Sequence, residues 1–150
     1  MEGQKSDPDS ARTLALAVEL RVLFGKVSRR LREQAHPGDF TSAQKSVLLR
    51  LERDGPATVT TLARAESVRP QSLGATVAAL QSAGLVAGTP DPADGRQTIL
   101  SLTDTCREMI QTSRAAKEDW LFRMIQTKLT SGEQEELSAA VELLKRVFDS

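Results

Sequence analysis

Asp91-Pro92-Ala93-Asp94-Gly95-Arg96-Gln97 lies between two apolar runs, Gly84-Leu85-Val86-Ala87 and Ile99-Leu100-Ser101-Leu102. Proline, aspartate and glycine favour turns, and each flanking run alternates apolar with small or polar residues, as a half-buried strand does. The stretch therefore predicts a β-hairpin whose tip holds Arg96 outward. Since the rest of the chain has helical patterns, this hairpin decides which fold the helices can form.

Helical spacing of apolar residues and capping signals predict six helices around the hairpin. Thr41-Ser42-Ala43-Gln44 and Thr130-Ser131-Gly132-Glu133 are capping boxes, and Thr58 and Thr103 can cap two further helices. Pro70 suits the first turn of a helix. The expected helices cover approximately residues 9–35, 42–53, 59–65, 70–83, 104–128 and 131–149.

The two ends of the chain carry longer helices than its centre. Their apolar stripes cannot all be buried by a small central core. Such stripes must pack against each other or against a second chain. We therefore expect a helical dimerisation region at residues 9–35 and 104–149 and a separate central domain at residues 41–103.

Composition argues against several classes of protein. The 20 basic and 20 acidic residues of the 150-residue chain balance, which disfavours binding to nucleic acid or acidic membranes by bulk charge, although a neutral total can contain a basic face. With one cysteine, one histidine and no tyrosine, neither an intramolecular disulfide nor a Cys/His metal cluster is expected. The chain has no apolar run of membrane-spanning length and no signal-peptide pattern at its start, so we expect a cytoplasmic protein with no membrane partner.

The central stretch carries a specific combination of short motifs. Leu80-x-x-x-Gly84-Leu85-Val86 is followed by Asp91-Pro92-x-Asp94-x-Arg96 and then by Leu100-x-Leu102-Thr103. This combination resembles the MarR family of bacterial transcription regulators, and the likeness covers nearly the whole chain. The resemblance implies a mainly α-helical fold with a small β-wing, that is, a winged helix-turn-helix plus a helical dimerisation layer. It also implies a symmetric dimer that represses or activates nearby genes and is often released from DNA by a small amphipathic ligand or an oxidant.

The resemblance further implies that the fourth helix enters the major groove of double-stranded DNA and that the wing arginine enters the adjacent minor groove. One arc of that helix, formed by Leu73, Val77 and Leu80, should face the core, which leaves the opposite side small and weakly polar. Glutamine and arginine side chains can form hydrogen bonds with base edges, and small apolar side chains can contact thymine methyl groups. Hydroxyl groups can bind the phosphate backbone. Asp94 can brace the wing by pairing with an arginine. The expected DNA contacts are Thr58, Thr60, Arg69, Gln71, Ser72, Ala75, Asp94 and Arg96.

Three positions depart from the family pattern. Gly74 and Ala75 stand where a threonine and an arginine are common, and Gly88 stands where relatives commonly have an arginine at the base of the wing. Gly74 also lowers helix stability by about 0.5–1 kcal/mol relative to alanine, unless close approach to DNA requires it. These departures keep open an alternative, a winged-helix protein-interaction module with weak or lost DNA binding. They also give Arg96 a large share of any DNA contact.

A ligand pocket is expected between the helical layer and the central domain, where a bound molecule would change the separation of the two fourth helices of a dimer. Cys106 falls in the first turn of a helix, where the helix N-terminus can lower a thiol pKa, but the chain has no second cysteine to resolve an oxidised thiol. A structural role for Cys106 is therefore weighed above oxidant sensing. The expected pocket residues are Leu20, Phe24, His36, Phe40, Val47 and Leu51.

The sequence thus predicts a ligand-responsive homodimer that binds an inverted-repeat operator, with a repressor favoured over an activator. No catalytic arrangement surrounds His36, so no enzyme activity, cofactor or metal is expected. A helical small-molecule-binding or catalytic protein with an incidental hairpin is a further alternative. It would leave the pattern over residues 41–103 without an explanation.

Overall fold

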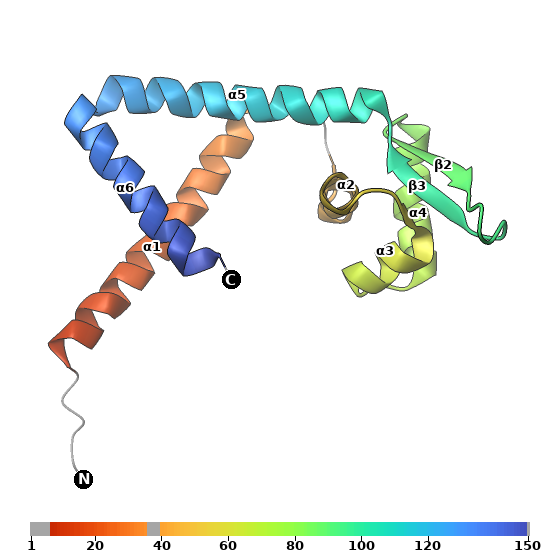
Figure 1. Cartoon of the computed structure of the whole chain (residues 1–150), viewed down its shortest axis with the longest axis horizontal. Helices are drawn as coiled ribbons and strands as arrows, with labels where there is room; N and C mark the ends of the chain where they lie inside the picture. Colours follow the sequence, from red (N-terminus) through yellow and green to blue (C-terminus); the bar gives the residue numbers. More distant parts are fainter. Residues whose placement is uncertain (1–6, 36–39, 150) are drawn as a thin grey trace, which may run out of the picture. The chain divides into compact units, whose positions relative to one another are not determined.

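The computed structural model describes residues 7–35 and 40–149, so His36, one of the predicted pocket residues, lies outside the described residues. The chain divides into two compact units (Figure 1). The helical unit comprises Met1–His36 and Ala115–Ser150, and the wing unit comprises Pro37–Arg114. In the part of the chain that the structure describes, no helix is both long and apolar enough to cross a membrane.

The wing unit combines short helices with a three-stranded antiparallel sheet of strand order β1-β3-β2. Figure 1 labels β2 and β3 of this sheet. Its elements are α2 (Ser42–Asp54), β1 (Ala57–Thr58), α3 (Val59–Glu66), α4 (Pro70–Ser82), β2 (Val86–Pro90), β3 (Thr98–Leu102) and the first part of α5 (Asp104–Lys128). The winged helix-turn-helix that the sequence predicts is therefore observed.

The hairpin forms where the turn motif predicts it, but its strands lie nearer to the tip. β2 starts at Val86 because Gly84 adopts a positive φ of 74° and closes α4 instead of entering the strand. Toward the tip the pairing continues to Pro90, which is opposite Thr98. The sequence does not predict β1, because a strand of two residues is too short to show an alternating pattern.

The helices begin at the predicted capping residues. The Thr41 hydroxyl accepts from the Gln44 amide while the Gln44 side chain accepts from the Thr41 amide, and Thr130 and Glu133 make the same reciprocal pair at the start of α6 (Ser131–Phe148). The Thr58 hydroxyl caps α3. Both capping boxes are confirmed, and the observed helix ends agree with the expected ranges to within one residue.

The wing unit has an apolar core that draws on its helices and on both hairpin strands. Leu73, Val77 and Leu80 of α4 are buried, which confirms the core-facing arc expected for this helix. The start of α5 belongs to the same core, because Cys106 is fully buried in it. The other buried residues are Val47, Leu48, Leu51, Leu62, Ala63, Leu85, Val86, Leu100 and Leu102.

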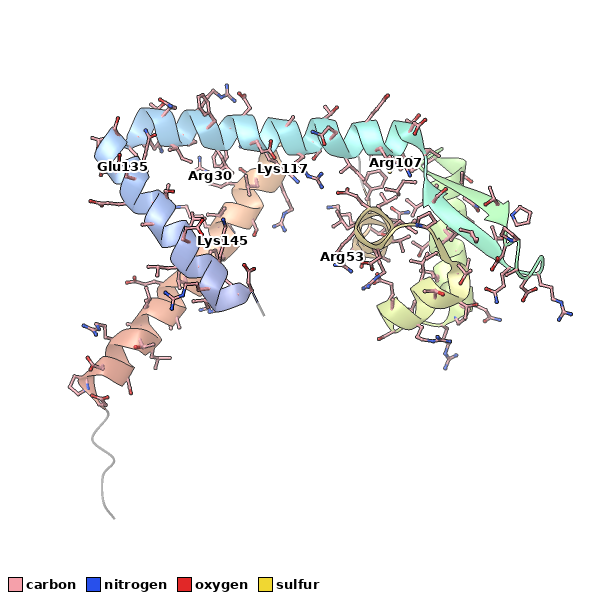
Figure 2. All side chains as sticks on the ribbon, viewed as in Figure 1. Arg30, Arg53, Arg107, Lys117, Glu135 and Lys145 are labelled. Carbon is pink, nitrogen blue, oxygen red and sulfur yellow. The ribbon has the colours of Figure 1, made fainter. Side chains whose placement is uncertain are left out.

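The helical unit consists of α1 (Pro8–Gln34), the second part of α5, and α6. Phe24 of α1 and Phe148 of α6 make an edge-to-face contact with ring centroids 5.8 Å apart. Arg30 of α1, labelled in Figure 2, lies over the Trp120 ring of α5, and its guanidinium carbon is 5.3 Å from the ring centroid. None of the described residues of α1 or α6 is buried in the single chain. The large apolar side chains that remain exposed in this unit are Leu14, Leu16, Val18, Val22, Leu23, Phe24, Phe122, Leu137, Val141, Leu143, Val147 and Phe148.

Candidate nucleic-acid interface

A short turn joins α3 to α4 and completes a helix-turn-helix. Ser67 adopts the left-handed conformation with φ 56°, and the Val68 amide donates to the Ala63 carbonyl at 3.0 Å, so the chain reverses directly after α3. Arg69 then precedes α4, whose first residue is Pro70. The N-terminus of α4 therefore stands at a place that the end of α3 determines.

The first turn of α4 is open to an anion. The Arg69 side chain makes no capping hydrogen bond, and Pro70 has no amide hydrogen. Gln71 and Ser72 are exposed, and backbone amides in a first helical turn have no partner within the helix. Such a helix end favours a phosphate. The structure thus brings Arg69, Gln71 and Ser72 together, with Ala75 exposed further along the same helix.

Asp94 organises the tip of the wing through the backbone. Its Oδ1 accepts from the Arg96 amide at 3.1 Å, and its carbonyl accepts from the Gln97 amide at 3.0 Å. The arginine pairing expected for Asp94 is not what the structure shows: no ion pair between described residues includes it, because its short side chain binds the amide two residues on. The Arg96 side chain is exposed.

The ion pairs of the wing unit separate its cations into two groups. Carboxylates neutralise the arginines of α2 and α5 through the pairs Arg50–Glu66, Arg50–Asp54, Arg53–Asp54, Arg107–Asp104 and Arg114–Glu52. Across residues 40–114, the described ion pairs leave out Lys45, Arg64, Arg69 and Arg96. Arg64 is in the last turn of α3, Arg69 is the residue directly before α4, and Arg96 is at the wing tip. Lys45 is in α2, and the three arginines without a carboxylate partner in these pairs are on the helix-turn-helix and the wing.

Arg64 is a candidate contact that the sequence does not single out. It is exposed in the last turn of α3, directly before the turn to α4. In the sequence it is one of several arginines between residues 41 and 103, and a charge count cannot tell which of them have carboxylate partners. The ion pairs of the folded chain supply that distinction.

The two predicted threonine contacts differ in what their hydroxyls do. The Thr58 hydroxyl accepts from the Thr61 amide at 3.1 Å and donates to the Thr61 hydroxyl at 3.0 Å. Thr60 is exposed on the first turn of α3. Thr60 is therefore better placed than Thr58 to donate to a phosphate.

Two glycines that depart from the family pattern have different surroundings. A Cβ on Gly88 would lie 2.6 Å from Thr98 Cγ2 and 3.2 Å from the Gln81 side-chain nitrogen. The base of the wing thus has no room for the arginine that relatives commonly carry unless Thr98 moves. A Cβ on Gly74 would meet no atom of the described residues within 4 Å. Packing within the chain does not require glycine at that place in α4.

Cys106 is held in the core at the start of α5. The Thr103 hydroxyl donates to the Gly84 carbonyl at 2.7 Å and accepts from the Cys106 amide at 3.1 Å, so Thr103 caps α5 as expected. Burial raises the pKa of the Cys106 thiol, and the nearby Arg107 offsets this only in part. The lowering by a helix N-terminus that the sequence allows is therefore outweighed, because desolvation disfavours the thiolate. The structure supports the structural role rather than the redox role.

The residues predicted to line a ligand pocket fall in both units. Leu20 and Phe24 belong to the helical unit. Val47 and Leu51 are core residues of the wing unit, and Phe40 packs against that core. The structure thus brings the last three together, and the complete pocket stays a prediction.

A cleft of about 300 Å³ lies within the wing unit, between the end of α2, β3 and the first part of α5. β1 is short, and Pro56, which would continue it opposite Ser101, has no amide hydrogen to extend the ladder. On the α5 side stand Arg107 (Figure 2) and Arg114, and the latter pairs with Glu52 at 2.6 Å. The lining residues are Leu51, Glu52, Gly55, Pro56, Ser101, Leu102, Arg107, Ile110, Gln111 and Arg114.

Sequence comparisons agree with this geometry. A sequence model described as the MarR family matches residues 39–97. The HTH-type transcriptional regulator MT0903.1 of Mycobacterium tuberculosis is 33% identical over 134 residues, which cover 89% of this chain and 93% of that protein. The HTH-type transcriptional regulator ML2140 of Mycobacterium leprae is 32% identical over the same length and the same shares.

Solved structures share the fold. A putative transcriptional regulator from Pseudomonas aeruginosa matches with a TM-score of 0.78 and 33% identity, covering 93% of this chain and 97% of that chain. The apo form of wild-type MarR from Escherichia coli matches with a TM-score of 0.65 and 26% identity, covering 89% and 96%. A mutant of MepR from S. aureus, solved bound to an oligodeoxyribonucleotide, is 18% identical and shares the fold with a TM-score of 0.68 over 88% and 97% of the two chains. These relatives confirm a regulator rather than an enzyme, and the chain belongs to the MarR family of transcriptional regulators.

Proposed function

We propose that this regulator is a homodimeric repressor that binds an inverted-repeat operator and responds to a small ligand. The observation that carries the proposal is the separation of charge in the wing unit. Carboxylates of the chain pair with the arginines of α2 and α5, whereas Arg64, Arg69 and Arg96 have no such partner among the described residues. In protein–DNA complexes, guanidinium groups form charge-assisted hydrogen bonds with backbone phosphates.

The exposed groups suit the two grooves of DNA in different ways. In the major groove, Gln71 can make paired hydrogen bonds to adenine, Arg69 can bond to guanine or a phosphate, and Ala75 can contact a thymine methyl. Ser72 and Thr60 supply hydroxyls for the phosphate backbone. Arg96 at the wing tip is the proposed contact to a narrow, A·T-rich minor groove, where the negative potential is strongest.

The helical unit is the proposed dimerisation region. We assign α1, the second part of α5 and α6 to dimerisation and the wing unit to DNA binding. Residues 104–114, which the sequence groups with the dimerisation region, belong to the wing unit. The exposed apolar side chains of α1 and α6 support this assignment, because monomeric proteins seldom expose so many large apolar groups on one unit. A two-fold dimer presents two copies of α4, which fit two half-sites about one helical turn apart.

The cleft of the wing unit is the proposed ligand site. Its lining includes the apolar residues Leu51 and Leu102 and the charged residues Arg107 and Arg114. A small amphipathic molecule suits this mixture, with an apolar body against the leucines and a polar group toward the arginines. Ligand in contact with both α2 and α5 would compete for the Glu52–Arg114 ion pair and change how α5 is held.

Selection of genomic fragments by the purified full chain tests the proposal. An inverted repeat with half-sites about 10–11 base pairs apart should be recovered. Replacing Arg96 by alanine should lower affinity for that repeat by about 1–3 kcal/mol. Arg123→Ala is the matched control, because Arg123 pairs with Asp119 on α5 within the helical unit. A reporter gene placed behind the repeat should fall in expression when the regulator is present.

A protein-interaction module is the second candidate function. The observation that favours it is the small exposed side of α4, where Gly74 and Ala75 stand in place of longer polar residues. Recovery of no enriched repeat, together with equal retention of the wild type and the Arg96→Ala variant on DNA, would support this module and exclude the regulator of an operator.

A further inference from the structure

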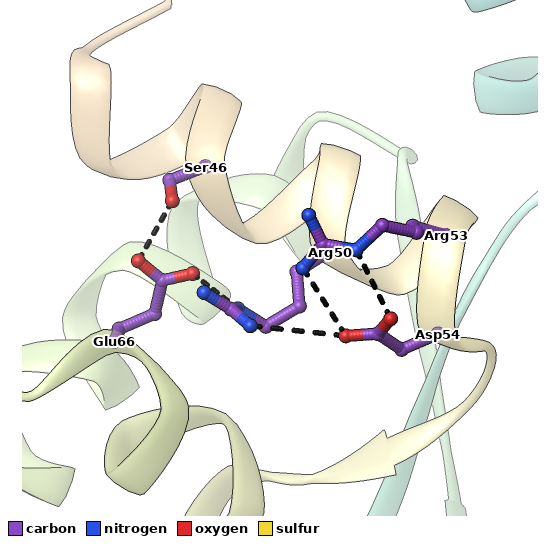
Figure 3. A network of polar contacts seen from close by, with 5 residues as sticks. All are labelled: Ser46, Arg50, Arg53, Asp54 and Glu66. Carbon is purple, nitrogen blue, oxygen red and sulfur yellow. Dashed lines mark hydrogen bonds and ion pairs between the residues drawn. The ribbon is translucent and has the colours of Figure 1, made fainter. Parts of the chain in front are cut away.

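We propose that Glu66 is a positioning residue for DNA recognition, because it holds the end of α3 on α2 and thereby sets the place of the α4 N-terminus. The inference rests on the proposed function, since it concerns how the same helix-turn-helix reads DNA. We assign Glu66 no direct contact with DNA. Its carboxylate faces Ser46 and Arg50 of its own chain (Figure 3).

One carboxylate joins two successive turns of α2 (Figure 3). Glu66 Oε2 accepts from the Ser46 hydroxyl at 2.7 Å, and Oε1 accepts from Arg50 Nε at 2.7 Å. The Glu66 side chain is 16% exposed and that of Arg50 27%. Charge-assisted hydrogen bonds that are partly shielded from water are stronger and more directional than ion pairs on an open surface. The last turn of α3 is thus fastened to α2.

The location of Glu66 is unfavourable for α3 alone. Glu66 is the last residue of this helix, where the negative end of the helix dipole disfavours a carboxylate. Hydrogen bonds from Arg50 and Ser46 nevertheless lower the pKa of its carboxyl group, so the charged form is well stabilised in the fold. The contact with α2, and not the stability of α3, therefore accounts for a glutamate in this position.

The short turn between α3 and α4 fixes the start of α4 relative to Glu66. Only Ser67, Val68 and Arg69 separate Glu66 from Pro70, the first residue of that helix. The left-handed Ser67 and the bond from the Val68 amide to α3 leave this turn little freedom. Paired hydrogen bonds to a base edge require precise placement of the side chains that make them. A displaced α3 end would move the first turn of α4 out of register with the bases.

Charge and placement predict opposite effects for the loss of Glu66. Arg53 pairs with Asp54 at 3.1 Å and Arg50 reaches Asp54 at 3.7 Å, so two guanidiniums face two carboxylates in this network (Figure 3). Deleting the Glu66 carboxylate leaves one positive charge in excess, which would strengthen binding to any DNA. If Glu66 positions α4, the same deletion weakens binding to the operator instead.

Three variants of the full chain separate these effects. Glu66→Gln can keep both hydrogen bonds, because its amide oxygen accepts from Arg50 and its amide nitrogen can donate to the Ser46 hydroxyl. Glu66→Ala keeps neither. Asp119→Ala is the control, since it makes the same change in net charge and deletes an ion pair, with Arg123, that lies in the helical unit. Fluorescence anisotropy at one salt concentration gives the affinity for the selected operator and for a random duplex of equal length.

The ratio of operator affinity to random-duplex affinity decides the outcome. Glu66→Ala should lower this ratio by about tenfold or more, and Glu66→Gln should stay within about threefold of the wild type. Asp119→Ala should leave the ratio unchanged. The proposal is overturned if Glu66→Ala keeps the wild-type ratio, if Glu66→Gln falls as far as Glu66→Ala, or if the control falls equally. Failure of the proposed function looks different, because the wild type itself would then prefer no operator.

Amide hydrogen exchange gives a second readout that needs no DNA. The Val68 and Leu73 amides, bonded to Ala63 and Arg69, report on the end of α3 and the start of α4. Both should exchange faster in Glu66→Ala than in Glu66→Gln or Asp119→Ala, because only Glu66→Ala releases α3 from α2. Equal protection in all three variants would contradict the positioning role.

Discussion

Replacing Gly88 by alanine tests whether the base of the wing is closed to side chains. The new Cβ would stand 2.6 Å from Thr98 Cγ2, far inside the 3.5–4.0 Å or so at which carbon atoms attract each other. Thr98 is β-branched, so its methyl moves only if χ1 changes. Overpacking of this kind destabilises by about 1–3 kcal/mol, whereas the reduced freedom of the unfolded chain stabilises by about 0.4–1 kcal/mol. We expect a net loss of roughly 1 kcal/mol.

The effect of Gly88→Ala on stability should change from destabilising to neutral or stabilising once the Thr98 methyl is removed. Thr98→Ser deletes Cγ2 and keeps the hydroxyl, so the close contact of Gly88→Ala disappears in that background. Gly88→Ala should then be neutral or stabilise by about 0.4–1 kcal/mol. Urea unfolding followed by circular dichroism measures all four members of the double-mutant cycle, with protein concentration held constant because association adds to apparent stability.

Two results would refute the reasoning. If Gly88→Ala stabilises the wild-type chain, the wing base has room for a side chain. If Thr98→Ser leaves a destabilising effect of Gly88→Ala unchanged, the Thr98 methyl is not its cause. Gly74→Ala in α4 is the matched control. No atom of the described residues lies within 4 Å of its added Cβ, so it should raise stability by about 0.5–1 kcal/mol.

Three further predictions concern charge and burial. Arg64→Ala should weaken binding to operator and to random DNA about equally, and it should reduce the slope of log affinity against log salt by about one per protomer. Anisotropy titrations at several salt concentrations measure this slope. An unchanged slope would show that Arg64 makes no phosphate contact. Arg50 and Ser46 hold the pKa of Glu66 below its ordinary value of 4.5, so the stabilisation from this group is complete above that value and is lost as pH falls through the lowered pKa. In urea unfolding between pH 7 and pH 3, the free energy of unfolding should fall less in Glu66→Gln than in the wild type. Equal falls would contradict this link between Glu66 and acid stability. The Cys106 thiol is fully buried and its pKa is raised, so it should react with iodoacetamide only as fast as the wing unit unfolds. Rapid labelling of the folded chain, detected by mass spectrometry, would show instead that the thiol is accessible.

The parts of the fold that the sequence predicts well are those encoded by near neighbours. Thr41 and Gln44 are three residues apart and make their capping box by themselves. The hairpin tip is similar, because Asp94 binds the amide of Arg96 two residues on. The buried face of α4 also follows from spacing along a single helix. Such features need no knowledge of distant partners.

The parts that the sequence does not predict depend on residues brought together by folding. Glu66 meets Ser46 and Arg50 across twenty and sixteen positions, so its role cannot be read from its neighbours. Burial of Cys106 reverses the pKa shift that its place in a helix would suggest. The crowding at Gly88 comes from a facing strand, and it gives a physical reason for the absence of the arginine expected there.

The ion pairs of α2 also bear on how the regulator would search a genome. Non-operator DNA holds a protein through phosphates alone, and about 10⁶–10⁹ such sites compete with one operator. If Arg50 and Arg53 lacked Glu66 and Asp54, every encounter with unrelated sequence would last longer, and more of the protein would be trapped away from its target. In the proposed operator-binding role, neutralising these two arginines would lower the number of molecules that a cell must make to keep one operator occupied.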